Sequence, residues 1–117
     1  IILTTKSVGA TRLRALRKKA DAVKICGAKK INFTRALRWL RDEWNVHRLL
    51  CEGGGELNDA LFREDLVDEI NLTVSPNVTG GSGSRLTDGA SDMLLRFGLQ
   101  HVLEDDGFLF LRYVRHR

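Results

Sequence analysis

The sequence of 117 residues contains no uninterrupted apolar run that approaches the length of a membrane-spanning helix. It also contains no internal repeat, and its first residues do not form the charged-then-apolar pattern of a signal peptide. The short Gly/Ser stretch at 80–84 is too small to separate two domains. The composition, 43% hydrophobic and 29% charged, is ordinary for a globular protein. We therefore predict one domain over residues 1–117, with no membrane partner.

Cysteine and histidine are scarce. The two cysteines, Cys26 and Cys51, each end an apolar run, and we interpret them as small buried hydrophobic residues in a reducing cytosol. A disulfide stays open as an alternative. The three histidines are scattered, and His47 lies four residues from Cys51 without further ligands nearby. We therefore expect no metal site, and a cytoplasmic protein.

Basic residues outnumber acidic ones, which gives a formal net charge of +4. Part of this charge is concentrated in one run: Arg12, Arg14, Arg17, Lys18 and Lys19. Nucleic-acid binding is one interpretation of such a run. The alternative is a solvated helix face near an anionic cofactor, and we favour it because few aromatics flank the run and no nucleic-acid motif is present. We expect no specific nucleic-acid partner.

Hydrophobic spacing predicts strands that alternate with helices and a closing hairpin. The expected strands are 1–5, 21–26, 47–51, 70–74, 99–104 and 108–114, and the expected helices are 11–20, 33–44 and 55–64. Asn32 is placed to cap the second helix. Pro76 ends a strand and opens a long loop over 77–92, and 105–107 (Asp-Asp-Gly) predicts the hairpin turn. Alternation of this kind predicts an α/β fold of three layers, α/β/α, with a mixed sheet that ends in an antiparallel hairpin.

The most informative segment joins the expected strand 47–51 to the expected helix 55–64. Glu52 ends the apolar run, three glycines follow, and an apolar pattern at helical spacing begins at once. Glycines let an outside group approach the main chain closely, and the first N–H groups of a helix have no partners within it. Together they favour binding of a phosphate. A simple tight turn is the alternative, and neither the dinucleotide fingerprint of Rossmann folds nor a Walker loop is present.

The wider pattern resembles the C-terminal half of the riboflavin-biosynthesis pyrimidine reductase domain, which shares the dihydrofolate reductase fold. The residues that carry the resemblance are Glu52-Gly53-Gly54-Gly55, Leu57-Asn58, Ala60-Leu61, Leu66-Val67-Asp68-Glu69-Ile70, Val74-Ser75-Pro76 and Gly80-Gly81. An acid before the glycines, with Leu-Val-Asp-Glu one helix later, is far more specific than the glycines alone.

The resemblance implies a site for each part of the reaction. In such reductases the glycine turn and helix start hold the pyrophosphate of NADPH, which here implies Gly53, Gly54, Gly55, Glu56, Leu57 and Asn58. The Thr-Thr pair faces the adenosine ribose and its 2′-phosphate, which implies Thr4 and Thr5. The acid ahead of the glycines, Glu52, faces the substrate, although capping of a neighbouring helix is the alternative. Glu56 departs from the commoner small residue or proline and brings a carboxylate near the phosphates. No residue is indicated as a general acid or base.

The resemblance also implies a reaction, the reduction of a phosphoribosylamino-pyrimidine to its ribitylamino form with NADPH. The family's domain is about twice as long, so we expect that an N-terminal portion is missing and that these 117 residues alone bind NADPH weakly or not at all. The rival hypotheses are another oxidoreductase of the dihydrofolate reductase fold with an unknown substrate, and a non-catalytic truncated remnant. We expect a homodimer.

Overall fold

The computed structural model describes residues 1–83, 85–89 and 92–116. The chain divides into two compact units, Ile1–Leu50 and Cys51–Arg117. Each unit combines one or more helices with a small sheet, and the strands pair in parallel in the first unit and antiparallel in the second. The expected α/β class with both kinds of strand pairing is confirmed.

The first unit is built on two short parallel strands. Strand β1 (Ile2–Thr4) pairs with β2 (Val23–Ile25), with Thr4 opposite Ile25. Between them lie the 3-10 turn η1 (Lys6–Val8) and helix α1 (Ala10–Arg17). The basic residues of the 12–19 run are all exposed, which is compatible with either interpretation of the run.

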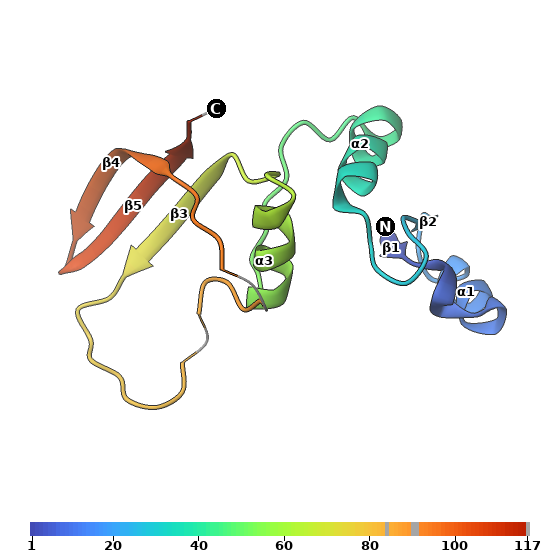
Figure 1. The fold of residues 1–117 in the computed structure, drawn as a ribbon, viewed down its shortest axis with the longest axis horizontal. Helices are drawn as coiled ribbons and strands as arrows, with labels where there is room; N and C mark the ends of the chain where they lie inside the picture. Colours follow the sequence, from blue (N-terminus) through green and yellow to red (C-terminus); the bar gives the residue numbers. More distant parts are fainter. Residues whose placement is uncertain (84, 90–91, 117) are drawn as a thin grey trace. The chain divides into compact units, whose positions relative to one another are not determined.

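Helix α2 (Phe33–Trp44) completes the first unit (Figure 1). The Asn32 side chain accepts a hydrogen bond from the N–H of Arg35 at 2.7 Å, which confirms the predicted cap. The helix buries one face through Ala36 and Leu40, and Cys26 after β2 is fully buried. Asn45 ends the helix in the left-handed conformation that commonly follows a last helical turn.

The second unit contains helix α3 (Gly55–Arg63) and strands β3 (Glu69–Val74), β4 (Phe97–Asp105) and β5 (Phe108–Arg115). The strand order is β3-β5-β4, and both pairings are antiparallel. Asp106 and Gly107 join β4 to β5 with φ values of 47° and 77°. Two positive φ values in a two-residue loop suit the twist of a hairpin, so the turn predicted over 105–107 is confirmed.

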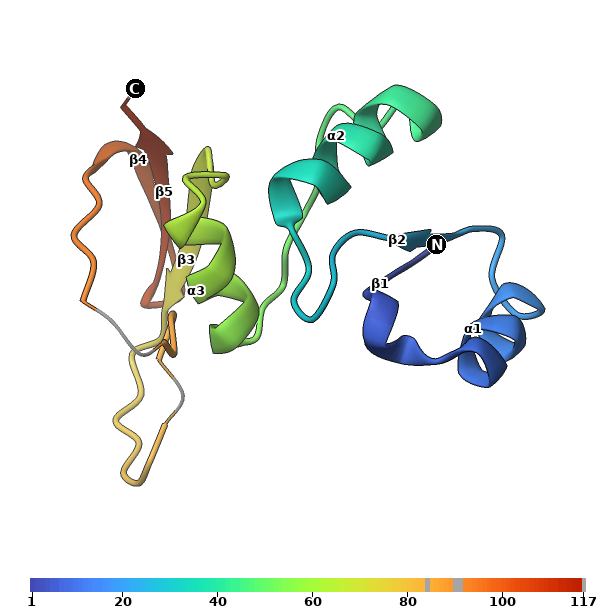
Figure 2. The same cartoon turned by 45° about the vertical axis from the view of Figure 1, so that its right-hand side comes forward.

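Helix α3 lies beside this sheet in both views (Figures 1 and 2). Its Phe62 ring meets the ring of Phe97 on β4 edge-on, with centroids 6.0 Å apart. Leu61 and Phe62 are buried, and Ile70 of β3 lines a small apolar hollow together with Phe62 and Phe97. The apolar side of α3 therefore anchors the helix, and with it the glycine turn, to the sheet.

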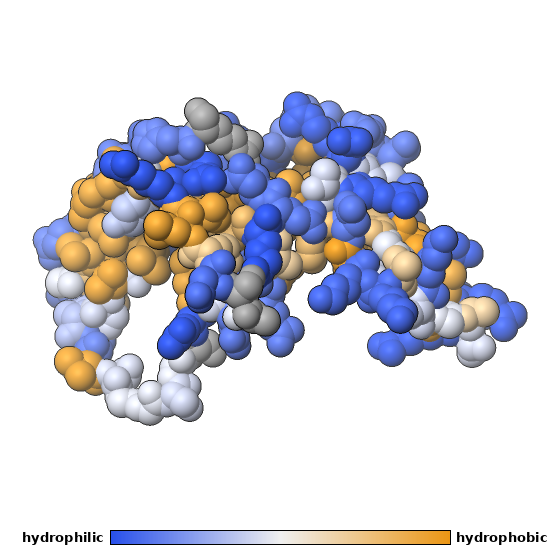
Figure 3. Space-filling view, in the orientation of Figure 1, coloured by the Kyte–Doolittle hydropathy of each residue, from blue (hydrophilic) through white to orange (hydrophobic). Residues whose placement is uncertain are grey.

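The sheet keeps much apolar surface exposed. The register aligns Leu72, Leu111 and Val102 across the three strands, on the face that α3 covers in part. Hydrophobic residues gather over the sheet in the space-filling view (Figure 3). The exposed members on this face include Leu72, Leu99, Val102 and Leu109. Burying them requires a further surface, since an apolar sheet face is stabilised by contact with another element.

Two predictions about the segment before α3 are wrong, namely a strand over 47–51 and a buried Cys51. Residues 45–54 contain neither helix nor strand, so the strand expected over 47–51 is not formed, and the parallel and antiparallel pairings stay in separate sheets. A strand depends on neighbours with which its backbone can pair, and an apolar run alone does not provide them. For the same reason Cys51, expected to be buried, is exposed. Both cysteines are free.

None of the helices in the described parts of the chain is long and apolar enough to span a bilayer.

Candidate functional site: the glycine turn and a cationic pocket

The glycine turn leads directly into α3. Gly54 is the N-cap of this helix, and among the residues that the structure describes no side chain is hydrogen-bonded there as a cap. The N–H of Asn58 donates to the carbonyl of Gly54 at 3.0 Å, which is the first hydrogen bond within the helix. The amides ahead of it, those of Gly55, Glu56 and Leu57, are the N-terminal donors that a helix leaves without partners of its own. These donors lie at the positive end of the helix dipole and suit an anion.

The three glycines of the turn differ in backbone conformation and in the space around them. Gly53 has φ of 88°, which disfavours residues with a side chain. A Cβ on Gly55 would lie 2.9 Å from the Cβ of Asp88, so a larger residue would push a neighbouring segment away. A Cβ on Gly54 would meet nothing within 4 Å. The turn is therefore packed on one side and open at Gly54, the side from which a ligand can approach.

The neighbouring segment is part of the predicted long loop. The Asn58 side chain donates to the carbonyl of Leu86 at 2.8 Å, and the N–H of Asp88 donates to the carbonyl of Gly55 at 3.1 Å. The Cys51 thiol also donates to the side-chain oxygen Oδ1 of Asn58 at 3.5 Å. The Asn58 side chain thus holds the turn and the loop together. Sequence reasoning missed this docking.

Two acidic residues flank the free amides. Glu52 is exposed in the segment before the turn, and it does not cap α3, so the capping alternative is not met at this helix. Glu56 is exposed in the first turn of α3, where a carboxylate is favoured by the helix dipole and would repel a bound phosphate. The two side chains therefore oppose a diphosphate that the backbone amides attract.

Further along α3, Asp59 is a buried charged residue with a partner. Its carboxylate accepts hydrogen bonds from Nε of Arg63 at 2.6 Å and from the Arg63 terminal nitrogen at 3.0 Å. This hydrogen-bonded pairing raises the pKa of Arg63 above its ordinary value. The Arg63 guanidinium therefore compensates the charge of the Asp59 carboxylate, and we interpret the pair as a structural feature of α3.

The two threonines belong to the first unit. Thr4 ends β1, and its carbonyl accepts a hydrogen bond from the N–H of Cys26 at 2.8 Å. The Thr5 hydroxyl lies 2.7 Å from the Ser7 hydroxyl. Lys6 and Ser7 donate their backbone N–H groups to the carbonyls of Gly27 and Ala28 at 2.9 and 3.2 Å. The segment after β1 is therefore fixed against the segment after β2, and the threonines lie at the carboxyl end of a parallel pair.

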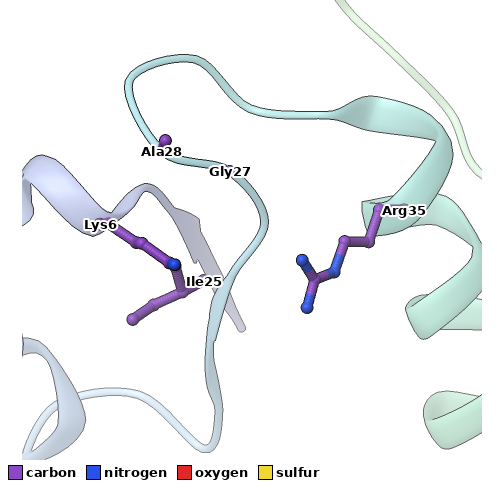
Figure 4. Close-up of a pocket in the computed structure, with 5 residues that line it drawn as sticks. All are labelled: Lys6, Ile25, Gly27, Ala28 and Arg35. Atoms are coloured by element: carbon purple, nitrogen blue, oxygen red, sulfur yellow. The ribbon is translucent and has the colours of Figure 1, made fainter.

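A pocket opens at this place (Figure 4). It has a volume of about 340 Å³ and is lined by Lys6, Ile25, Gly27, Ala28 and Arg35. The side chains of Lys6 and Arg35 come from two different elements, η1 and α2, and point toward one another (Figure 4). Sequence reasoning did not single out either cation, although Lys6 directly follows the two threonines and Arg35 lies three residues after the cap Asn32.

Within the described ranges, no group of three or more His, Cys, Asp or Glu residues is arranged to hold a metal ion.

Comparison with known proteins identifies the family of this chain. The RibD C-terminal domain model matches residues 1–109. The 2,5-diamino-6-ribosylamino-4(3H)-pyrimidinone 5′-phosphate reductase of Methanothermobacter thermautotrophicus is 32% identical over 90 residues, which are 76% of this chain and 41% of that protein. The protein of the same name from Archaeoglobus fulgidus is 35% identical over 81 residues, or 68% of this chain and 36% of that protein. The chain thus spans less than half the length of these relatives.

Solved structures give the same fold. A pyrimidine reductase-like protein from Corynebacterium diphtheriae superimposes with a TM-score of 0.82 at 20% identity, over 98% of this chain and 49% of that one. RibD of Acinetobacter baumannii, form 2, gives a TM-score of 0.71 at 21% identity, over 98% of this chain and 37% of that one. These likenesses confirm the predicted fold, and the match over residues 1–109 shows that the chain belongs to the RibD C-terminal domain family.

Proposed function

We propose that this chain supplies the NADPH-binding part of a pyrimidine reductase of riboflavin biosynthesis. The reaction would reduce a phosphoribosylamino-pyrimidine to its ribitylamino form. The names of the two archaeal relatives support a pyrimidinone 5′-phosphate as the substrate class. The single observation that carries the proposal for the cofactor is the start of α3, where the N-cap is a glycine, no side chain of the described residues caps the helix, and the space beside Gly54 is open.

The residues divide the cofactor between them. The amides of Gly55, Glu56 and Leu57 would donate hydrogen bonds to the diphosphate, and Gly53 would shape the turn at which it arrives. Asn58 would contribute indirectly by holding the turn in place, because its own N–H and side chain are already hydrogen-bonded. Thr4 and Thr5 would face the adenosine ribose and its 2′-phosphate. Glu52 would face the substrate, where its exposed carboxylate can accept hydrogen bonds from hydroxyl or amino groups.

NADPH would bring the hydride, and the protein would orient the nicotinamide and the substrate. We assign no residue of this chain as a general acid or base. A cofactor site without such a group is consistent with hydride transfer, because binding and orientation provide much of what the protein contributes.

The test uses the full-length protein that contains these residues. We expect NADPH to be consumed in the presence of the phosphoribosylamino-pyrimidine and a ribitylamino product to form. Dihydrofolate in place of the pyrimidine should give no turnover, and turnover of dihydrofolate alone would favour the rival oxidoreductase. Absence of NADPH binding to the full-length protein would favour the non-catalytic remnant and contradict the proposal.

We propose a homodimer as the working state of a cytoplasmic enzyme. The exposed apolar residues of the β3-β5-β4 sheet, such as Leu99 and Val102, support an association surface. Light scattering should give twice the mass of one chain. A monomer at all concentrations would contradict this part of the proposal.

A further inference from the structure

The segment 85–89 (Arg-Leu-Thr-Asp-Gly), which we call the strap, belongs to the loop after β3 and returns to the start of α3 (Figures 1 and 2). The N–H of Asp88 donates to the carbonyl of Gly55 at 3.1 Å. The carbonyl of Leu86 accepts a hydrogen bond from the Asn58 side chain at 2.8 Å. The strap is therefore bonded to the first turn of the helix at two separate places.

The strap also lies against the packed part of the second unit. Leu86 and Thr87 line the same small apolar hollow as Phe62 of α3 and Phe97 of β4. The rings of Phe62 and Phe97 meet edge-on. The strap is thus fixed on one side by hydrogen bonds to the helix start and on the other by the apolar contact region between α3 and the sheet.

Two glycines allow the strap to lie this close to the helix. A Cβ on Gly55 of the helix would lie 2.9 Å from the Cβ of Asp88. A Cβ on Gly89 of the strap would overlap the carboxylate of Asp59. Asp59 is only 9% exposed, and both of its carboxylate oxygens accept hydrogen bonds from Arg63. The carboxylate cannot move aside without losing these bonds, so the docked strap requires glycine at position 89.

The glycine turn itself has few other supports. Residues 45–54 contain neither helix nor strand, and no side chain in the described parts of the chain caps α3. Glycine loses more conformational freedom on ordering than any other residue, so three consecutive glycines are costly to fix. A helix of nine residues gains little order from its own hydrogen bonds. Order at the start of α3 therefore depends on tertiary contacts, and the strap supplies them.

We propose that the strap positions the first-turn amides of α3 for the cofactor diphosphate, with Asp59 and Gly89 as positioning residues. The strap fixes these amides before the cofactor arrives, so that binding does not have to supply their ordering. It leaves the approach to Gly54 open, because a Cβ there would meet no atom of the described chain within 4 Å. The role of the strap rests on the proposed function, because the diphosphate is taken as the ligand of these amides.

The experiment uses the full-length protein, labelled with 15N, and NADPH as the probe. Gly89→Ala should displace the strap and lower the backbone order parameters of residues 55–57 in the cofactor-free protein, from about 0.85 toward 0.6. NADPH affinity measured by calorimetry should fall roughly tenfold, which corresponds to ordering the backbone of about one residue on binding. KM for NADPH should rise with it while kcat at saturating NADPH stays unchanged, since the diphosphate takes no part in hydride transfer.

Gly83→Ala is the matched control. It makes the same substitution in the same loop, at a position where a Cβ would meet no described atom within 4 Å, and it should change neither the order parameters nor the affinity.

A double variant tests whether the close contact is the cause. Asp59→Ala removes the carboxylate that a Cβ at position 89 would overlap, and alone it should weaken NADPH binding less than Gly89→Ala does. Asp59→Ala combined with Gly89→Ala should bind NADPH more tightly than Gly89→Ala alone, because the new methyl group then has room. Independent damage at two places would instead add up.

Three results would overturn the inference: unchanged order at residues 55–57 in Gly89→Ala, lost order with unchanged NADPH affinity, or additive losses in the double variant. If Gly89→Ala does not fold, NADPH affinity of Asp59→Ala equal to that of Gly83→Ala would overturn it. A wild-type full-length protein that binds no NADPH would refute the proposed function and the role of the strap with it, whereas tight NADPH binding that ignores Gly89→Ala refutes the strap alone.

Discussion

Gly54→Asp should strengthen the fold and weaken cofactor binding at the same time. Gly54 has φ of −76° and ψ of −169°, extended values that any residue adopts, and its Cβ position is open. A carboxylate at this N-cap would accept hydrogen bonds from the first turn of α3. An aspartate N-cap stabilises a helix by a few tenths of a kcal/mol more than a glycine does, which raises Tm by roughly 1–2 °C for a domain of this size.

The same carboxylate would occupy the place proposed for the diphosphate. Two unit charges about 4 Å apart repel by about 1 to 4 kcal/mol between the dielectric of water and that near a protein surface. NADPH affinity should therefore fall fivefold or more, before the loss of the amide hydrogen bonds is added. The helix gains a cap and the cofactor loses its donors, so the two effects have opposite signs.

Calorimetric titration of the full-length protein with NADPH measures the affinity, and thermal unfolding measures the stability. Gly80→Asp adds the same charge at a position where a Cβ also meets nothing within 4 Å, and it serves as the control. If Gly54→Asp raises Tm while NADPH affinity stays unchanged, the amides of α3 do not hold the cofactor and the reasoning is refuted.

Two further substitutions test the surroundings of the site. Glu56→Gln removes the carboxylate that opposes the diphosphate, so the NADPH affinity measured by calorimetry should rise about two- to fivefold. The loss of the favourable interaction with the helix dipole should lower the free energy of unfolding by about 0.3–1 kcal/mol. An unchanged affinity would mean that the phosphates bind elsewhere. Asn32→Ala removes the cap of α2 and should lower the free energy of unfolding in urea by about 1 kcal/mol, whereas Asn32→Gly should cost only a few tenths. An unchanged free energy of unfolding in Asn32→Ala would mean that the 2.7 Å hydrogen bond from Arg35 contributes nothing.

Local signals in the sequence predicted the elements whose causes are local. The cap Asn32 and the apolar spacing after it predicted α2, and Asp106 with Gly107 predicted the hairpin turn. Each of these features is decided by a few neighbouring residues, through a capping hydrogen bond or through φ values that glycine tolerates. The same holds for the start of α3 at the three glycines.

Features that depend on distant residues were not predictable in this way. The expected strand 47–51 has the right composition, but strand formation requires pairing partners that the local pattern does not provide. The loop contact of Asn58 with Leu86 joins residues 28 positions apart. The pocket likewise joins Lys6 to Arg35, and neither residue is conspicuous among the many basic residues of the first 50.

The most direct test of the central claim follows the backbone amides of Gly55, Glu56 and Leu57 by NMR while NADPH is added to the 15N-labelled full-length protein. The account predicts that these three amides shift together and saturably, and that Gly54→Asp abolishes the shifts. Saturable binding of NADPH that leaves all three amides unshifted would contradict it.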